Sequence, residues 1–160
     1  MKNLLAIFLM AILFASCEGP MGPPGRDGLD GENSEPTSWV IEDEIEVRSS
    51  DWQLSKNEAG EPIYTYDFRI KDKDFDLYKK AYYEGLVTSY MYLDFGDKDL
   101  EAQTPLPNPV NRQDKDGNLW TETYSYDYTV DGFIIFKVSI SDFFLDQKPP
   151  TTYFRVALTY

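Results

Sequence analysis

The sequence predicts an all-β fold, a two-sheet antiparallel β-sandwich with one short helix, preceded by a signal peptide and a flexible linker. Three observations predict it. Tyr, Phe, Val, Ile and Thr are abundant after residue 36 and alternate with polar residues, which is the pattern of half-buried strands. Only the segment 74–84 has helical spacing. Residues 36–160 fit one domain, and an immunoglobulin-like or jelly-roll-like Greek key is the expected arrangement.

Six or seven strands are expected, and the alternation assigns six of them. Their apolar faces, in chain order, are formed by Trp39, Ile41, Ile45 and Val47; by Tyr64, Tyr66, Phe68 and Ile70; by Val87, Met91, Leu93 and Phe95; by Trp120, Tyr124, Tyr126 and Tyr128; by Ile134, Phe136, Val138 and Ile140; and by Phe154, Val156, Leu158 and Tyr160. The residues between them are mostly polar, such as Glu42, Glu44 and Glu46 in the first strand. Because each strand has one apolar face, the strands are expected to enclose one core between two sheets.

One helix is expected between the second and third strands. Phe75, Tyr78 and Tyr82 fall at helical spacing, and Gly85 follows as the C′ residue. The pattern therefore predicts a helix over 74–84.

The segment from Pro105 to Gly117 is rich in Pro, Asn and Asp and predicts a long loop, either an ordinary turn region or a binding loop. Its end, 114–118, is similar to part of a calcium loop. The full calcium pattern fails where Arg112 and Thr123 stand. The stretch therefore predicts an Asp-Gly turn that opens a strand, and no metal site.

The beginning of the chain has the parts of an export signal. Lys2 gives a positive start, Leu4 to Phe14 is uninterrupted hydrophobe, and the small residues Ala15-Ser16 precede Cys17, the sole cysteine. The apolar stretch is shorter than the ~20 residues that a membrane-spanning helix needs. The segment resembles a bacterial lipoprotein signal, which implies that residues 1–16 are removed and Cys17 carries the lipid. The alternative is an ordinary secreted protein with a stray cysteine.

A strict Gly-X-Y run extends from Gly19 to Asn33. Glycine at every third position is the rule of the collagen triple helix, because only Gly fits at its crowded axis. The run is either a short stalk that forms a weak trimer or an extended spacer, and its shortness favours the spacer. Residues 17–35 are therefore expected to be a lipidated cysteine and a collagen-like linker.

A lipid-bearing cysteine followed at once by Gly-Pro triplets resembles a group of uncharacterised lipoproteins from Bacteroidota. The resemblance continues in the body of the chain, at Ser50-Asp51-Trp52, Gln103-Thr104-Pro105-Leu106-Pro107, Tyr126-Asp127-Tyr128-Thr129 and Phe154-Arg155-Val156. It implies stable anchoring in the bacterial cell envelope as an outer-membrane lipoprotein, with the surface and periplasmic faces both left open. It implies no established activity.

The composition argues against most catalytic chemistry. The chain has no histidine, which removes the commonest general base, the commonest zinc ligand and the Ser-His-Asp triad. The sole cysteine, Cys17, is assigned to the lipid. We therefore expect no enzyme activity, no cofactor and no metal. A carboxylate-based hydrolase is the remaining catalytic alternative, because glycoside hydrolysis needs only two Asp or Glu residues.

The net charge and the aromatic residues bear on partners. A net charge of −13 disfavours nucleic-acid binding, which requires a basic patch. Tyr90 and Tyr92 lie opposite the apolar face of their strand and are the candidate ligand-stacking residues, because exposed Tyr stacks well on sugar rings. The alternative is that they flank a sheet edge or pack under the helix. We expect a noncatalytic binding module for a glycan or a protein, or alternatively a structural subunit of the cell envelope.

Overall fold

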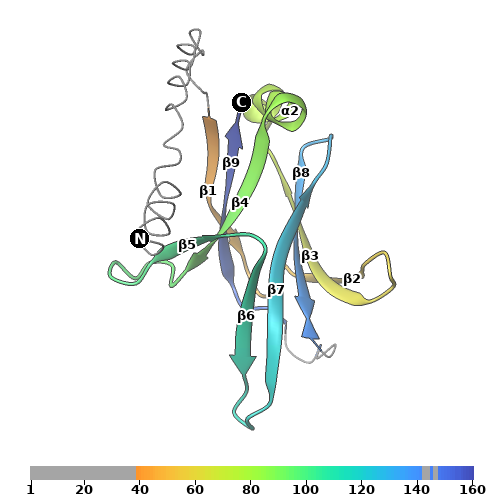
Figure 1. Cartoon of the computed structure of the whole chain (residues 1–160), viewed down its shortest axis with the longest axis vertical. Coiled ribbons are helices and arrows are strands. Elements are labelled where there is room, and N and C mark those ends of the chain that lie inside the picture. Colours follow the sequence, from red (N-terminus) through yellow and green to blue (C-terminus); the bar gives the residue numbers. More distant parts are fainter. Residues whose placement is uncertain (1–38, 142–144, 146–147) are drawn as a thin grey trace, which may run out of the picture. The chain divides into compact units, whose positions relative to one another are not determined.

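The computed structural model describes residues 39–141, 145 and 148–160. The predictions for the lipidated Cys17, the Gly-X-Y run and the signal peptide lie outside the described residues. Within them the chain forms strands, one short 3-10 helix and one α-helix (Figure 1). In chain order these are β1 (Trp39–Val47), β2 (Gln53–Lys56), β3 (Pro62–Arg69), η1 (Asp72–Asp74), α2 (Phe75–Glu84), β4 (Leu86–Leu93), β5 (Ala102–Pro105), β6 (Asn108–Gln113), β7 (Leu119–Tyr128), β8 (Phe133–Ile140) and β9 (Thr152–Thr159).

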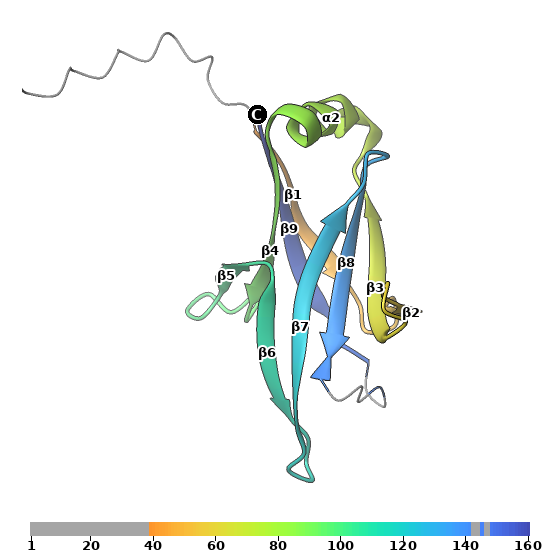
Figure 2. The ribbon, with the colours of Figure 1, turned by 45° about the vertical axis from the view of Figure 1, so that its right-hand side comes forward.

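The strands form two antiparallel sheets that lie face to face (Figure 2). One sheet has the order β1-β9-β4-β5 and the other the order β2-β3-β8-β7-β6. The predicted two-sheet sandwich with one short α-helix is thus confirmed. Strands β6, β7 and β8 are joined by hairpins, and β3 lies beside β8 although β4 to β7 intervene in the chain, which is a Greek-key relation.

Aromatic rings fill the middle of the sandwich. Trp52, in the connection between β1 and β2, contacts Tyr124 of β7 and Phe154 of β9 edge to face, with ring centroids 6.4 and 6.2 Å apart. Phe154 also stacks on Phe136 of β8 at 4.1 Å. All four side chains are almost completely buried. Because each large ring removes much apolar surface from water, this cluster joins the two sheets.

The six strands assigned from the sequence are all present, as β1, β3, β4, β7, β8 and β9. Three short strands, β2, β5 and β6, were not predicted. The prediction of a long loop from Pro105 to Gly117 is wrong, because β6 occupies Asn108–Gln113 and pairs with β7. The predicted Asp-Gly turn is confirmed between them: Asp114 Oδ1 accepts hydrogen bonds from the backbone of Asp116 and Asn118, both at 2.9 Å.

The first strand contains an irregularity that the alternation did not predict. The pairing of β1 with β9 shifts by one residue between Glu42 and Ile45, and Glu44 has a φ of 54°. Glu42 therefore pairs with Val156 and Ile45 with Phe154, two residues on the same inner face. The prediction that Glu42 lies on the polar face is wrong, and its side chain is only 6% exposed.

The third predicted strand also ends differently from its pattern. β4 stops at Leu93, and Asp94 has a φ of 52°. This turn carries Phe95 away from the inner face, where the alternation had placed it, and stacks its ring on Tyr153 of β9 with centroids 3.9 Å apart. Phe95 thereby joins the outer face of the β1-β9-β4-β5 sheet.

Helix α2 covers the end of the sandwich at which β9 finishes. Tyr78 is its buried anchor, and its hydroxyl donates a hydrogen bond to the carbonyl oxygen of Thr129. Gly85 follows the helix as predicted, but its φ of −136° is not the left-handed conformation of a C′ glycine. Glycine is required here because a Cβ would lie 2.0 Å from the carbonyl oxygen of Thr159.

Candidate functional site

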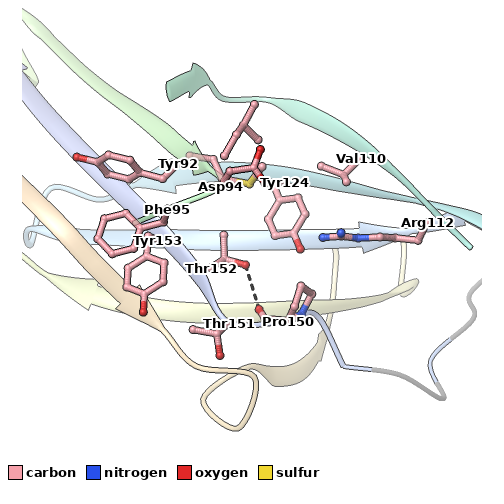
Figure 3. Close-up of a pocket in the computed structure, with 12 residues that line it drawn as sticks. Tyr92, Asp94, Phe95, Val110, Arg112, Tyr124, Pro150, Thr151, Thr152 and Tyr153 are labelled. Atoms are coloured by element: carbon pink, nitrogen blue, oxygen red, sulfur yellow. Dashed lines mark hydrogen bonds between the residues drawn. The ribbon is translucent and has the colours of Figure 1, made fainter. Parts of the chain in front are cut away.

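A pocket of about 410 Å³ lies at the last residues of β4 and the first residues of β9 (Figure 3). It lies where β4 and β9 meet β6 and β7, and the segment before β9 closes one side. This volume falls in the range of small-ligand sites. The described lining residues are Met91, Tyr92, Leu93, Asp94, Phe95, Val110, Arg112, Tyr124, Pro150, Thr151, Thr152 and Tyr153.

One side of the pocket is an aromatic wall of Tyr92, Phe95 and Tyr153, whose rings lie on the outer face of the β1-β9-β4-β5 sheet. Phe95 lies between the other two rings, stacked on Tyr153 at 3.9 Å and edge to face with Tyr92 at 5.2 Å. The hydroxyl of Tyr153 donates a hydrogen bond to Glu46 at 3.2 Å, which holds that ring in position. The wall therefore combines flat apolar faces with fixed polar atoms.

The opposite wall is polar and centres on a carboxylate that is itself buried. Glu122 of β7 has a side chain only 4% exposed. Its Oε2 accepts hydrogen bonds from Arg112 Nε at 3.0 Å and from the Tyr124 hydroxyl at 2.8 Å, and its Oε1 accepts one from Trp120 Nε1 at 3.3 Å. Both oxygens of this buried charge are therefore satisfied, as buried ionised groups require.

The electrostatics of this wall follow from burial beside Glu122. Burial raises the pKa of Tyr124 to about 12, and the charge of Glu122 acts in the same direction. Burial lowers the pKa of Arg112, but the hydrogen bonds and charge interactions with Glu122 and Tyr124 together outweigh it, and the net shift is upward. At neutral pH the wall therefore presents a protonated phenol and a guanidinium cation.

The structure separates the two tyrosines that the sequence singled out. Tyr92 lines the pocket, whereas Tyr90 is half-buried and is not among the described lining residues. Tyr92 is less open than predicted, with 8% of its surface exposed. Its ring is covered by Phe95 and by the guanidinium of Arg155, which lies 5.8 Å from the ring centroid. The role of both residues in ligand stacking stays a prediction.

Asp43 connects Tyr92 to the neighbouring strands. It accepts hydrogen bonds from the Tyr92 hydroxyl and from Arg155, whose Nη2 lies 2.6 Å from Oδ2. The hydrogen bond from Arg155 is the largest cause that lowers the pKa of Asp43 to about 2. Burial, followed by the hydrogen bond to Asp43, raises the pKa of Tyr92 to about 12. These hydrogen bonds fix the position of Tyr92 within the aromatic wall.

Sequence reasoning missed the polar wall. Arg112 was used only as a mismatch in a calcium pattern, within a segment expected to be a loop. Glu122 stands between Trp120 and Tyr124 in a run whose other even-numbered members were assigned to the apolar face, so its parity indicated that it points inward. That parity was the one available signal, because a buried carboxylate has no hydrophobic pattern.

The described residues contain no group of three or more Asp, Glu, Cys or His side chains placed to hold a metal ion. In the same part of the chain, no helix is long and apolar enough to cross a membrane.

Comparison with protein families, with curated proteins and with solved structures finds no match to this chain.

Proposed function

We propose that this protein is a noncatalytic binding module anchored to the bacterial cell envelope through Cys17, and that its pocket binds a glycan. The observation that carries the proposal is that a stacked aromatic wall and a fixed polar wall line the same pocket. Aromatic faces pack against the C–H faces of sugar rings, and Arg112 supplies hydrogen bonds to hydroxyl groups. The absence of histidine from the sequence supports a binding role over a catalytic one.

The full chain, purified in detergent, should bind members of a panel of plant, host and bacterial oligosaccharides. Tyr153→Ala removes a ring of the aromatic wall and should weaken binding roughly five- to tenfold, which corresponds to the ~1–1.5 kcal/mol contributed by one aromatic contact. Tyr83→Ala is the matched control, because Tyr83 is an exposed tyrosine of α2, remote from the pocket. Equal effects of both substitutions, or no binding to any member of the panel, would contradict the proposal.

Anchoring is tested in the native cells by palmitate labelling of the chain and of its Cys17→Ala variant. Label that disappears in the variant supports lipidation of the thiol. Protease treatment of intact cells then distinguishes the two faces of the outer membrane: loss of the domain supports a surface location, and protection supports a periplasmic one. A wild-type chain that takes up no label would contradict the anchor.

A structural subunit of the cell envelope is the second candidate function, and one observation favours it. Tyr83, Leu86 and Tyr128 are 69%, 64% and 42% exposed. The first and last are linked through Tyr82, whose ring centroid lies 5.0 Å from Tyr83 and 5.7 Å from Tyr128. Exposed apolar groups that gather at one end of a domain are typical of an interface.

The assembly role predicts an oligomer in which this tyrosine cluster is buried between copies. Light scattering on the full chain should then give a multiple of the monomer mass that falls on Leu86→Ser. Gly25→Ala distinguishes the alternative trimer through the Gly-X-Y run, because a substituted glycine disrupts a collagen helix and leaves the tyrosine cluster intact. A monomer in every sample would contradict the assembly role.

A further inference from the structure

The guanidinium group of Arg112 is anchored on Glu122 and also interacts with the Tyr124 hydroxyl. Its Nε donates to Glu122 at 3.0 Å, and Glu122 is fixed in turn by Trp120 and Tyr124. The guanidinium is planar and carries five N–H donors, so a group that binds one carboxylate and one hydroxyl still has donors for another partner. The side chain of Arg112 is 36% exposed, and its guanidinium points across the pocket toward the Tyr124 hydroxyl and Pro150 (Figure 3).

Arg112 is also the one cation among the described lining residues. Asp94 is the one carboxylate among them, and it is exposed to solvent, where water and salt screen its charge. Among the described residues no carboxylate besides Glu122 lies within ion-pair distance of Arg112. A rigid arginine with its terminal edge directed into a pocket is the arrangement that binds a carboxylate through two parallel hydrogen bonds.

The aromatic wall and the arginine together define the ligand. Phe95 and Tyr153 line the pocket on one side and the Arg112 guanidinium lies on the other, with Thr152 and Tyr124 between them (Figure 3). A sugar ring that carries a carboxylate, such as a uronic or sialic acid, has an apolar face for the aromatic side chains and an acid group for Arg112. The net charge of −13 disfavours polyanionic chains, whose many charges are repelled at long range, whereas one acid group in direct contact with Arg112 is not excluded.

We propose that the pocket selects an acidic sugar bearing a single carboxylate, and that Arg112 recognises the carboxylate. This inference rests on the proposed glycan-binding function and names the class of glycan. Arg112 acts as the specificity-determining residue, and Glu122 acts as a positioning residue through it. The aromatic wall contacts the remainder of the sugar.

The first test changes the ligand and leaves the protein intact. Glucuronic acid, galacturonic acid and N-acetylneuraminic acid are titrated calorimetrically into the full chain in detergent, beside glucose, galactose and glucuronamide. At least one acid should bind about tenfold or more tightly than its neutral counterpart, because hydrogen bonds to charged groups are worth roughly that factor or more. Glucuronamide keeps the shape of glucuronic acid and removes only the charge.

The second test changes the arginine. Arg112→Gln should abolish the preference for the acid, and Arg112→Lys should restore it only in part, because an ammonium cannot form the paired contact. Arg69→Gln is the matched control, since Arg69 is an exposed arginine beside η1, remote from the pocket. Far-ultraviolet circular dichroism and the thermal midpoint of each variant check its folding. If Arg112→Gln is unfolded, the comparison of acid with amide on the unchanged chain decides alone.

The outcomes separate the two proposals. Equal binding of acidic and neutral sugars, or tighter binding of a polyanionic chain than of the single acid, overturns the inference and leaves glycan binding in place. Preference for the acid that persists in a folded Arg112→Gln variant also overturns it. Binding of no sugar, acidic or neutral, overturns the glycan-binding function itself and the inference with it.

Discussion

Glu42 and Glu122 are two carboxylates buried on inner faces of opposite sheets, with side chains 6% and 4% exposed, and they are stabilised very differently. Glu122 accepts hydrogen bonds from three side chains, one of them charged. Glu42 has Lys71 on Oε2 at 2.5 Å, and its Oε1 has no hydrogen-bond partner among the described residues. Burial alone therefore does not reveal the role of a charge.

The difference lies in what the partners do. Around Glu122 the partners are held by the core, so the carboxylate fixes the orientation of Arg112 and Tyr124 in the pocket wall. At Glu42 the partner is an ammonium that is 61% exposed, joined to the carboxylate across the edge between β1 and the start of η1. The partners of Glu122 therefore form part of the pocket wall. The pair of Glu42 and Lys71 instead joins β1 to the residue before η1 and leaves Glu42 Oε1 without a hydrogen bond among the described residues.

The largest expected effect tests this contrast with the same substitution in both places. Glu122→Leu removes the carboxylate that binds the Arg112 guanidinium and the Tyr124 hydroxyl, so the free energy of unfolding should fall by about 3–5 kcal/mol. Glu42→Leu removes the unsatisfied oxygen and returns Lys71 to water, so the change should stay within about 1 kcal/mol. Urea unfolding of the full chain measures both. Equal losses would show that the number of partners does not distinguish the two sites.

A smaller effect is expected when the partner of Glu42 is removed and the carboxylate stays. Lys71→Met leaves both oxygens of Glu42 without a partner, which should lower the free energy of unfolding by about 1–3 kcal/mol. The double variant Lys71→Met, Glu42→Leu should recover most of this loss, because no buried charge is left.

Lys98→Met serves as the control for this experiment, since Lys98 is exposed and has no ion pair among the described residues. It should leave the unfolding midpoint in urea unchanged. A double variant as unstable as Lys71→Met alone would mean that packing at Lys71 matters more than the charge of Glu42.

The smallest effect on stability is expected at a third carboxylate, Asp43. Its side chain accepts hydrogen bonds from Tyr92 and Arg155 but is 41% exposed. Its folded pKa of about 2 lies below the ordinary value of 3.8, so its contribution is complete above pH 3.8 and is lost as the pH falls toward 2. Asp43→Asn should therefore cost less than about 1 kcal/mol at pH 7, as solvent-screened pairs do.

Urea midpoints of the wild type and Asp43→Asn, measured from pH 7 down to pH 2, check this expectation. The difference between the two proteins should shrink to nothing at the acid end. A difference that persists at pH 2 would show that the side chain stabilises the fold through contacts other than its charge.

Most of the fold was predictable from the sequence, but little of the candidate site was. Six strands were predictable because apolar residues alternate along them. β6 was missed because its inward positions include Asn108 and Arg112, which carry no hydrophobic signal. The bulge in β1 was missed because it depends on the backbone of Glu44, and without it Glu42 reads as a solvent-facing residue.

The candidate site depends on such exceptions. Tyr92 was predictable as a residue of interest, but Phe95 reached the pocket only through the left-handed turn at Asp94. Arg112, Glu122 and Thr152 come from three different strands, and nothing in their sequence spacing indicates that they converge. Alternation along a strand predicts which face each residue occupies. It does not predict where strands end, and the residues that meet at those ends form the pocket.

The pairing of β1 with β9 has a mechanical consequence. Strand β1 begins at Trp39, opposite Thr159, whereas the pocket lies at the far end of β9, around Thr152. A pull between a ligand in the pocket and the start of β1 is directed along the strands. The hydrogen bonds of the β1–β9 ladder are then sheared together instead of being opened one after another, so a load between these two points is shared along the ladder.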